Sequence, residues 1–187
     1  LEWVAQEMEK PEGAGGGSGG NPGGDEGDDS GETGGNSKPI NVNVNNGTSQ
    51  AGESGASLTP PEKGWTTGSN TFSVSSGSPC MVAVSKDGGQ SYERLPATAN
   101  EDGSYSFTAE DMTQDSTLAI VLLGDINGDG KVTAADATKG SAAVLNKVEL
   151  EPLQKLAADT NNDGKLTTAD ITRLRAAVLG NTSLQWQ

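Results

Sequence analysis

Two stretches of the sequence decide its interpretation: DINGDGKVTAADATKGSAAVL at residues 125–145 and DTNNDGKLTTADITRLRAAVL at residues 159–179. The second begins 34 residues after the first (159 − 125), and 13 of the 21 aligned positions are identical. Such an internal repeat indicates that one structural unit occurs twice. Each copy begins Asp-x-Asn-x-Asp-Gly, continues for five residues and then has another Asp.

This spacing is that of an EF-hand calcium loop with Asp instead of Glu at position 12. Ca²⁺ prefers six to eight oxygen ligands, which alternate residues of a twelve-residue loop can supply. Gly130 and Gly164 stand at the sharp turn, where a left-handed backbone favours glycine. We expect two Ca²⁺ ions, with Lys131 and Lys165 binding through backbone carbonyls. The predicted ligands are Asp125, Asn127, Asp129, Lys131 and Asp136 in the first loop and Asp159, Asn161, Asp163, Lys165 and Asp170 in the second.

The flanking residues predict helices. We expect helices over residues 134–146 and 168–179, the second ended by Gly180, and a short helix from Pro152 to Ala158. Segments rich in Asp, Asn and Gly also form ordinary turns. Two in-register copies, each followed by a helix-compatible segment, favour calcium loops over turns.

Residues 64–123 change to a period of two, which is typical of strands. They predict a small antiparallel Ig-like β-sandwich of about five strands, with Asp87-Gly88-Gly89 as a hairpin turn. The apolar run Leu118–Leu123 suits a strand buried on both faces. A domain of this size is near the lower limit of independent stability, so we expect it to dock on its neighbour.

The N-terminal third has a different composition. Residues 11–63 read as a flexible acidic linker rich in Gly, Ser and Asn, and residues 1–10 as the tail of an upstream domain. The alternation of Ile40, Val42 and Val44 with Asn leaves two interpretations open. It is an apolar spot in the linker, which is favoured, or a strand added to the next module. The expected fold class is therefore mixed: disordered linker, β-sandwich and an all-α module with two loop–helix repeats.

Composition excludes several functions. The chain has no His and a single Cys, Cys80, which rules out His-based catalysis and any cluster of several Cys. Its net charge of −14 disfavours nucleic acid as a partner, and no apolar run is long enough to span a membrane. No pair of catalytic acids stands out, so we expect no enzyme in this fragment and no catalytic residues. The alternative of a glycan-binding β-domain, through Trp65, Tyr92 and Tyr105, is less favoured.

The repeat resembles a type I dockerin over residues 124–187, and the β-module more loosely resembles the X-modules that precede some dockerins. The resemblance implies a secreted, extracellular protein, monomeric before docking, that binds a cohesin of a cellulosome scaffoldin. It also implies that calcium is required and that a carbohydrate-active enzyme for polysaccharide catabolism belongs to the parent protein. Calcium sensing is a less favoured alternative because this region has no Met.

The resemblance also implies which residues face the cohesin, namely loop positions 10 and 11 and the exiting helix. The copies differ at Gly140 against Leu174 and at Ser141 against Arg175, so we expect the second helix to dominate, with Leu174 as an apolar anchor. Trp186 is either an aromatic residue that clasps the start of the module or part of a frayed tail. The predicted contacts are Ala134, Ala135, Lys139, Ser141, Ala142, Thr168, Ala169, Arg173, Leu174, Arg175 and Ala176.

Overall fold

The structure is a computed structural model that describes residues 37–47 and 54–187. All of the described residues lie in one unit of the chain, residues 35–187. The predicted upstream tail at residues 1–10 and the Gly-rich part of the predicted linker therefore lie outside the described residues.

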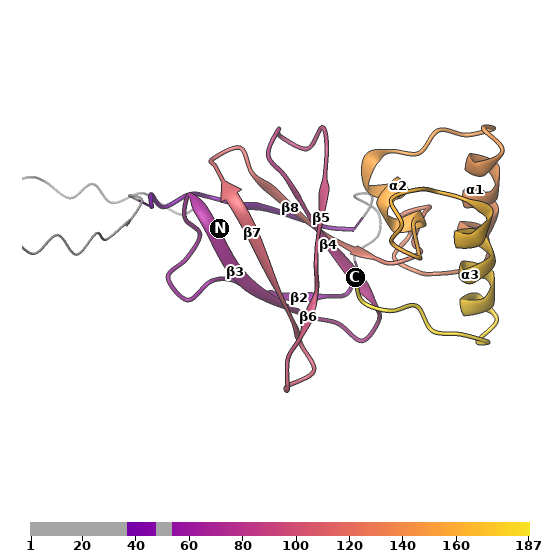
Figure 1. Ribbon diagram of the computed structural model, residues 1–187, viewed down its shortest axis with the longest axis horizontal. Coiled ribbons are helices and arrows are strands. Elements are labelled where there is room, and N and C mark those ends of the chain that lie inside the picture. The colour runs from indigo at the N-terminus through magenta and orange to yellow at the C-terminus, as the bar shows by residue number, and fades with distance from the viewer. Residues whose placement is uncertain (1–36, 48–53) are drawn as a thin grey trace, which may run out of the picture. The chain divides into compact units, whose positions relative to one another are not determined.

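The first half of this unit consists of two four-stranded sheets (Figure 1). One sheet has the strand order β1-β8-β4-β5, formed by Asn43–Asn46, Thr117–Leu122, Cys80–Ser85 and Glu93–Leu95. The other has the order β2-β3-β7-β6, formed by Ser57–Thr59, Gly68–Ser75, Tyr105–Met112 and Thr98–Ala99.

The prediction of about five antiparallel strands over residues 64–123 is close, because six strands lie there, β3 to β8, and every pairing among them is antiparallel. The prediction missed the two strands that precede them. The described residues contain eight strands, and β1 runs parallel to β8, with Asn43 opposite Thr117. β1 and β2 both lie within the residues assigned to the linker, so the β-module begins earlier than residue 64. The less favoured strand interpretation of residues 40–46 is the right one. Its signal was weak because the partner of this short Asn-rich strand is about 70 residues away in the sequence.

The interior of the sandwich contains the residues that alternate along the long strands. Phe72 on β3 stacks on Phe107 on β7, with ring centroids 5.9 Å apart, and Trp65 meets Phe72 edge-on at 5.3 Å. Cys80 is buried at the start of β4, and its burial raises the pKa of the thiol, as expected for an unreactive core cysteine.

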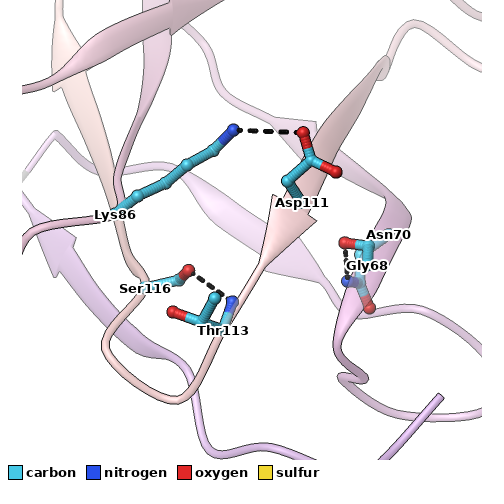
Figure 2. Close-up of polar contacts among 6 residues, drawn as sticks. All are labelled: Gly68, Asn70, Lys86, Asp111, Thr113 and Ser116. Atoms are coloured by element: carbon cyan, nitrogen blue, oxygen red, sulfur yellow. Dashed lines mark hydrogen bonds and ion pairs between the residues drawn. The ribbon is translucent and has the colours of Figure 1, made fainter.

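Short-range polar contacts shape the strand ends (Figure 2). Between β7 and β8, the backbone N–H of Thr113 donates to Ser116 Oγ at 2.8 Å. Lys86, just after β4, forms an ion pair with Asp111 of β7 at 3.9 Å. Both side chains of this pair are exposed, so we expect it to contribute little to stability.

Three helices follow the sheets: α1 Ala134–Val144, α2 Pro152–Ala158 and α3 Thr168–Val178. The short helix has the predicted bounds, while α1 and α3 end slightly earlier than expected. Each of these longer helices begins with a capping box, in which Thr133 pairs with Asp136 and Thr167 with Asp170. Figure 1 shows α1 and α3 side by side.

The outer face of the first sheet is covered by α2. Met81 and Ala83 of β4 and Val121 of β8 are buried together with Leu153 and Ala157 of the helix. Strand β8 is therefore buried on both faces, which explains its continuous apolar sequence. The expectation that the β-module docks on its neighbour is confirmed.

Candidate functional site

The first loop is organised around the carboxylate of Asp125. It accepts hydrogen bonds from the backbone N–H groups of Gly128 at 2.7 Å, Asp129 at 3.1 Å and Gly130 at 2.9 Å. The predicted turn residue Gly130 has a φ of 80°, which is the left-handed conformation the loop needs. The first predicted ligand thus holds the backbone of residues 128–130.

The carboxylate of Asp136 closes the same loop from its other end. One oxygen accepts from the N–H groups of Ile126 at 2.9 Å and Asn127 at 3.0 Å, and the other accepts from Thr133 N–H at 2.8 Å. Asp136 therefore joins the start of the loop to the start of α1, as residue N3 of the capping box.

The second loop repeats this arrangement. The carboxylate of Asp159 accepts from Asp163 N–H at 3.2 Å and Gly164 N–H at 2.9 Å. Asp170 accepts from the N–H groups of Thr160 at 3.0 Å and Asn161 at 3.2 Å. The two repeats thus share one local structure, as their sequence identity predicts.

These four carboxylates, Asp125, Asp136, Asp159 and Asp170, are almost completely buried, with exposed fractions of 2%, 0%, 5% and 0%. Burial raises the pKa of Asp125; backbone hydrogen bonds from Gly130, Gly128 and Asp129 oppose this, and the nearby negative charge of Asp136 adds to it. Two buried carboxylates of like charge in one loop favour the binding of a cation.

The remaining predicted side-chain ligands lie at the exposed edge of each loop. Asn127 donates to Asp129 at 3.0 Å, and Asn161 donates to Asp163 at 2.9 Å. In the described part of the chain, no three acidic side chains lie close enough together to hold a metal by themselves. A cation would therefore also need the Asn carbonyl oxygen and the backbone carbonyl at position 7. This all-oxygen set, with a charge of −3 per loop, fits Ca²⁺.

The predicted cohesin contacts fall into three groups by exposure. Lys139, Ser141, Ala142, Arg173 and Ala176 are half-buried, and Leu174 is completely buried. The exposed members are Ala134, Ala135, Thr168, Ala169 and Arg175.

The structure contradicts the prediction that Leu174 is a surface anchor. Leu174 lies in the helical core with Leu123 and Ile126. Its counterpart Gly140 is also buried, and a Cβ atom there would lie 2.5 Å from Ile171 Cδ1. The difference between these two positions thus serves the packing of α1 against α3. The prediction was wrong because the periodicity of a helix alone does not reveal which of its residues face the partner helix.

Two exposed leucines were missed by the sequence analysis. Leu145 follows the last residue of α1 and is 63% exposed, and Leu179 follows α3 and is 74% exposed. They occupy equivalent positions of the repeat (179 − 145 = 34). Their position in the sequence could have indicated this exposure. An apolar residue that recurs just after the end of each helix has few core residues within reach.

The C-terminal tail packs on the β-sandwich. Trp186 stacks on Tyr105 of β7, with ring centroids 4.2 Å apart and an interplanar angle of 15°. Neither expectation for Trp186, the clasp or the frayed tail, describes this contact. Leu184 instead lies in the helical core, beside Gly124 at the start of the module.

The three aromatic residues considered for glycan binding are engaged in packing. Trp65 contacts Phe72, Tyr105 lies against Trp186, and Tyr92 packs at the edge of the cluster between the sheet and α2. All three side chains are half-buried and packed on neighbouring residues, which weighs against the glycan-binding alternative.

The fold and the loops define a module with two EF-hand-like loop–helix repeats. The model of the dockerin type I domain family matches residues 123–179, so the C-terminal part of this chain belongs to the type I dockerins. This is a calcium-binding family of non-catalytic modules, and membership implies a cellulosomal, extracellular protein. None of the curated proteins compared with the chain matches it.

Two solved structures resemble the chain. Both are complexes of the third cohesin of ScaC with the ScaB dockerin of Acetivibrio cellulolyticus, displaying a type I interaction, one mutated in the N-terminal helix and the other in the C-terminal helix. Each match has 34% identity over 34% of this chain and 89% of the other, with a TM-score of 0.32. Separately, no helix among the described residues is both long enough and apolar enough to cross a membrane.

Proposed function

We propose that this chain binds two Ca²⁺ ions and attaches its parent protein to a cohesin of a cellulosome scaffoldin. The observation that carries the proposal is the duplicated network in which Asp125 with Asp136, and Asp159 with Asp170, organise two loops of the same form. A loop that needs a cation to balance buried carboxylates couples metal binding to the structure of the helix that follows.

The proposed docking face consists of the exposed residues of α1 and α3. Ala134 and Ala135 have their counterparts in Thr168 and Ala169, and all four are exposed. Small side chains there let a partner surface approach the helix starts. The exposed Leu145 and Leu179 add an apolar anchor at the end of each helix, in place of the buried Leu174.

We infer that α3 dominates the contact. Arg175 is exposed on α3, whereas the equivalent residue of α1 is Ser141. A guanidinium offers several hydrogen bonds in a fixed plane, and Leu179 lies near the end of the same helix. Binding in the reversed orientation, with α1 in the leading position, would lack the arginine.

Charge indicates the chemistry of the partner. Residues 125–187 contain eight acidic and seven basic residues, a net charge of −1, and two Ca²⁺ ions would change this to +3. We therefore expect an acidic cohesin surface and an association rate that falls as ionic strength rises. The parent protein is proposed to be secreted by an anaerobic bacterium, to be monomeric before docking and to act in polysaccharide catabolism.

A capture experiment tests the proposal. The full chain is immobilised and offered a panel of cohesins, with calcium and then with a calcium chelator. The Asp125→Ala/Asp159→Ala variant, which removes position 1 of both loops, is run alongside it, and Asp115→Ala, an exposed acid of the β7–β8 turn, is the matched control. We expect capture by the parent chain and the control in calcium only. Capture that persists in chelator would refute the proposal.

A further inference from the structure

Arg94 belongs to the sandwich but forms its hydrogen bonds with the dockerin. It lies on β5, at the edge of the first sheet. Its Nη1 donates to Asn162 Oδ1 at 2.9 Å and to Gln187 Oε1. Its Nη2 donates to the backbone carbonyl of Asp159 at 3.2 Å and to that of Leu156. One side chain thus contacts four acceptors that are distant in sequence.

These acceptors belong to three elements that meet at the second loop. Leu156 lies in the last turn of α2, and Asp159 is both the residue that caps this helix and position 1 of the loop. The last carbonyl groups of a helix have no partner within it, and a cation beside them is favourable. Gln187, the last residue, in turn donates to the Thr160 carbonyl at 2.9 Å. Arg94 therefore joins the end of α2, the start of the second loop and the C-terminal tail.

Asn162 provides an independent observation. Its φ is 58°, a left-handed conformation that costs a non-glycine residue about 1 kcal/mol. The equivalent residue of the first loop is Gly128, which has a φ of 77° and no side chain. The second loop thus has the residue that is less favourable for the backbone, and the side chain of that residue supplies an acceptor for Arg94.

We propose that Arg94 is a positioning residue that keeps the second loop and the C-terminal tail formed when calcium is absent. This inference rests on the proposed calcium binding. None of the four hydrogen bonds of Arg94 goes to residues 125–136, so this support is specific to the second loop. On removal of calcium, the first loop opens before the second, and the sandwich acts as part of the dockerin's folding unit.

Two glycine amides report on the two loops separately. Gly130 N–H donates to Asp125 and Gly164 N–H donates to Asp159, each at 2.9 Å. Amide hydrogen exchange at these positions is measured by NMR on the full chain, in excess calcium and in chelator. In chelator we expect the Gly164 amide to exchange at least roughly tenfold more slowly than the Gly130 amide. Hydrogen bonds from a charged group stabilise a local structure by a free energy that corresponds to a rate ratio of this size or larger.

Three variants separate positioning from charge. Arg94→Gln removes the charge and the planar guanidinium group. It should abolish the difference in amide exchange rate between Gly130 and Gly164. Arg94→Lys keeps the charge but cannot reach both pairs of acceptors at once, so it should lose most of the difference. Lys86→Gln removes a positive charge from the ion pair with Asp111 on the same sandwich (Figure 2) and should keep the full difference.

The outcomes decide the matter even if one variant folds poorly. Three results would each overturn the proposal. The first is an equal exchange rate at Gly130 and Gly164 in the parent chain. The others are an unchanged difference between these two rates in Arg94→Lys or Arg94→Gln, and loss of this difference in Lys86→Gln. Calcium titration of the parent chain is read in the same samples. Absence of calcium binding would refute the proposed function, whereas two bound ions with unequal loops unaffected by Arg94→Gln would refute only the role of Arg94.

Discussion

Arg175 donates a hydrogen bond from Nη2 to Ser141 Oγ at 2.9 Å, and these two residues occupy equivalent positions of the two repeats. The contact therefore joins α3 to α1 through the same position of the two repeats. A duplicated module can in principle offer either helix to a partner. Here α3 provides an arginine, and α1 provides a hydroxyl group that accepts one hydrogen bond from it. The two orientations in which the module could face a partner therefore differ in chemistry.

This asymmetry predicts unequal effects of mutations at the two exposed leucines. Leu179→Glu should weaken cohesin binding by about tenfold or more, since it places a charge on the face that we propose to dominate, while Leu145→Glu should have a smaller effect. Exchanging the asymmetric residues, as Ser141→Arg/Arg175→Ser, should reverse the order. Isothermal titration against one captured cohesin gives the affinities of the reference chain and of both leucine variants, before and after the exchange. Equal losses for both leucines, unchanged by the exchange, would contradict a preferred orientation.

The two exposed acidic residues proposed as ligands should affect calcium affinity without supporting the fold. Asp129 and Asp163 lie at the exposed edge of their loops and bond with Asn127 and Asn161. Asp129→Asn or Asp163→Asn should weaken one of two calcium sites by at least tenfold, because a hard cation loses a charged ligand. The melting temperature in chelator should change little. Calorimetric titration and thermal unfolding measure the two quantities; a variant that retains both sites at full affinity would count against the ligand assignment.

Gly140 should not tolerate a large side chain. A Cβ atom there would lie 2.5 Å from Ile171 Cδ1 and 2.8 Å from Ile126 Cδ1. Gly140→Leu should therefore lower the free energy of unfolding by about 1–3 kcal/mol through overpacking, despite its better helix propensity. Thr138→Leu, at an exposed position of the same helix, is the control. Denaturant unfolding in saturating calcium measures both, and a Gly140→Leu variant as stable as the control would show that the helices can separate without cost.

The C-terminal stack should stabilise the β-sandwich. Trp186 lies on Tyr105, and removing it by Trp186→Ala should cost about 1–2 kcal/mol in lost aromatic contact and apolar burial. Gln185→Ala, at the exposed preceding residue, should be neutral. Unfolding followed by near-ultraviolet circular dichroism reports on this aromatic pair. Identical unfolding of the two variants would mean that the tail does not contribute to the sandwich.

Local pattern was sufficient to predict the loops and the helices. The carboxylates of Asp125 and Asp136 bond with backbone groups of the same short loop, so the form of the loop can be predicted from the spacing. The short helix from Pro152 was likewise readable because proline favours a helix start. The burial of β8 on both faces was predicted from its apolar sequence alone.

Contacts between distant residues were not readable. The pairing of β1 with β8 joins residues about 70 positions apart, and an Asn-rich strand carries little hydrophobic pattern to show it. Leu174 was assigned to the surface because the sequence does not show which side of α3 packs against α1. Arg94 gave no signal, since a single cation in a short strand is usually solvated, and its acceptors are more than 60 residues away.

Native mass spectrometry of the full chain mixed with its cohesin, in a calcium buffer, tests the central claim most directly. We expect a complex of one chain and one cohesin with a mass increase of two calcium ions, and its dissociation when the ions are removed. A complex of the same stability with no bound calcium would contradict the claim that calcium-filled loops shape the docking face.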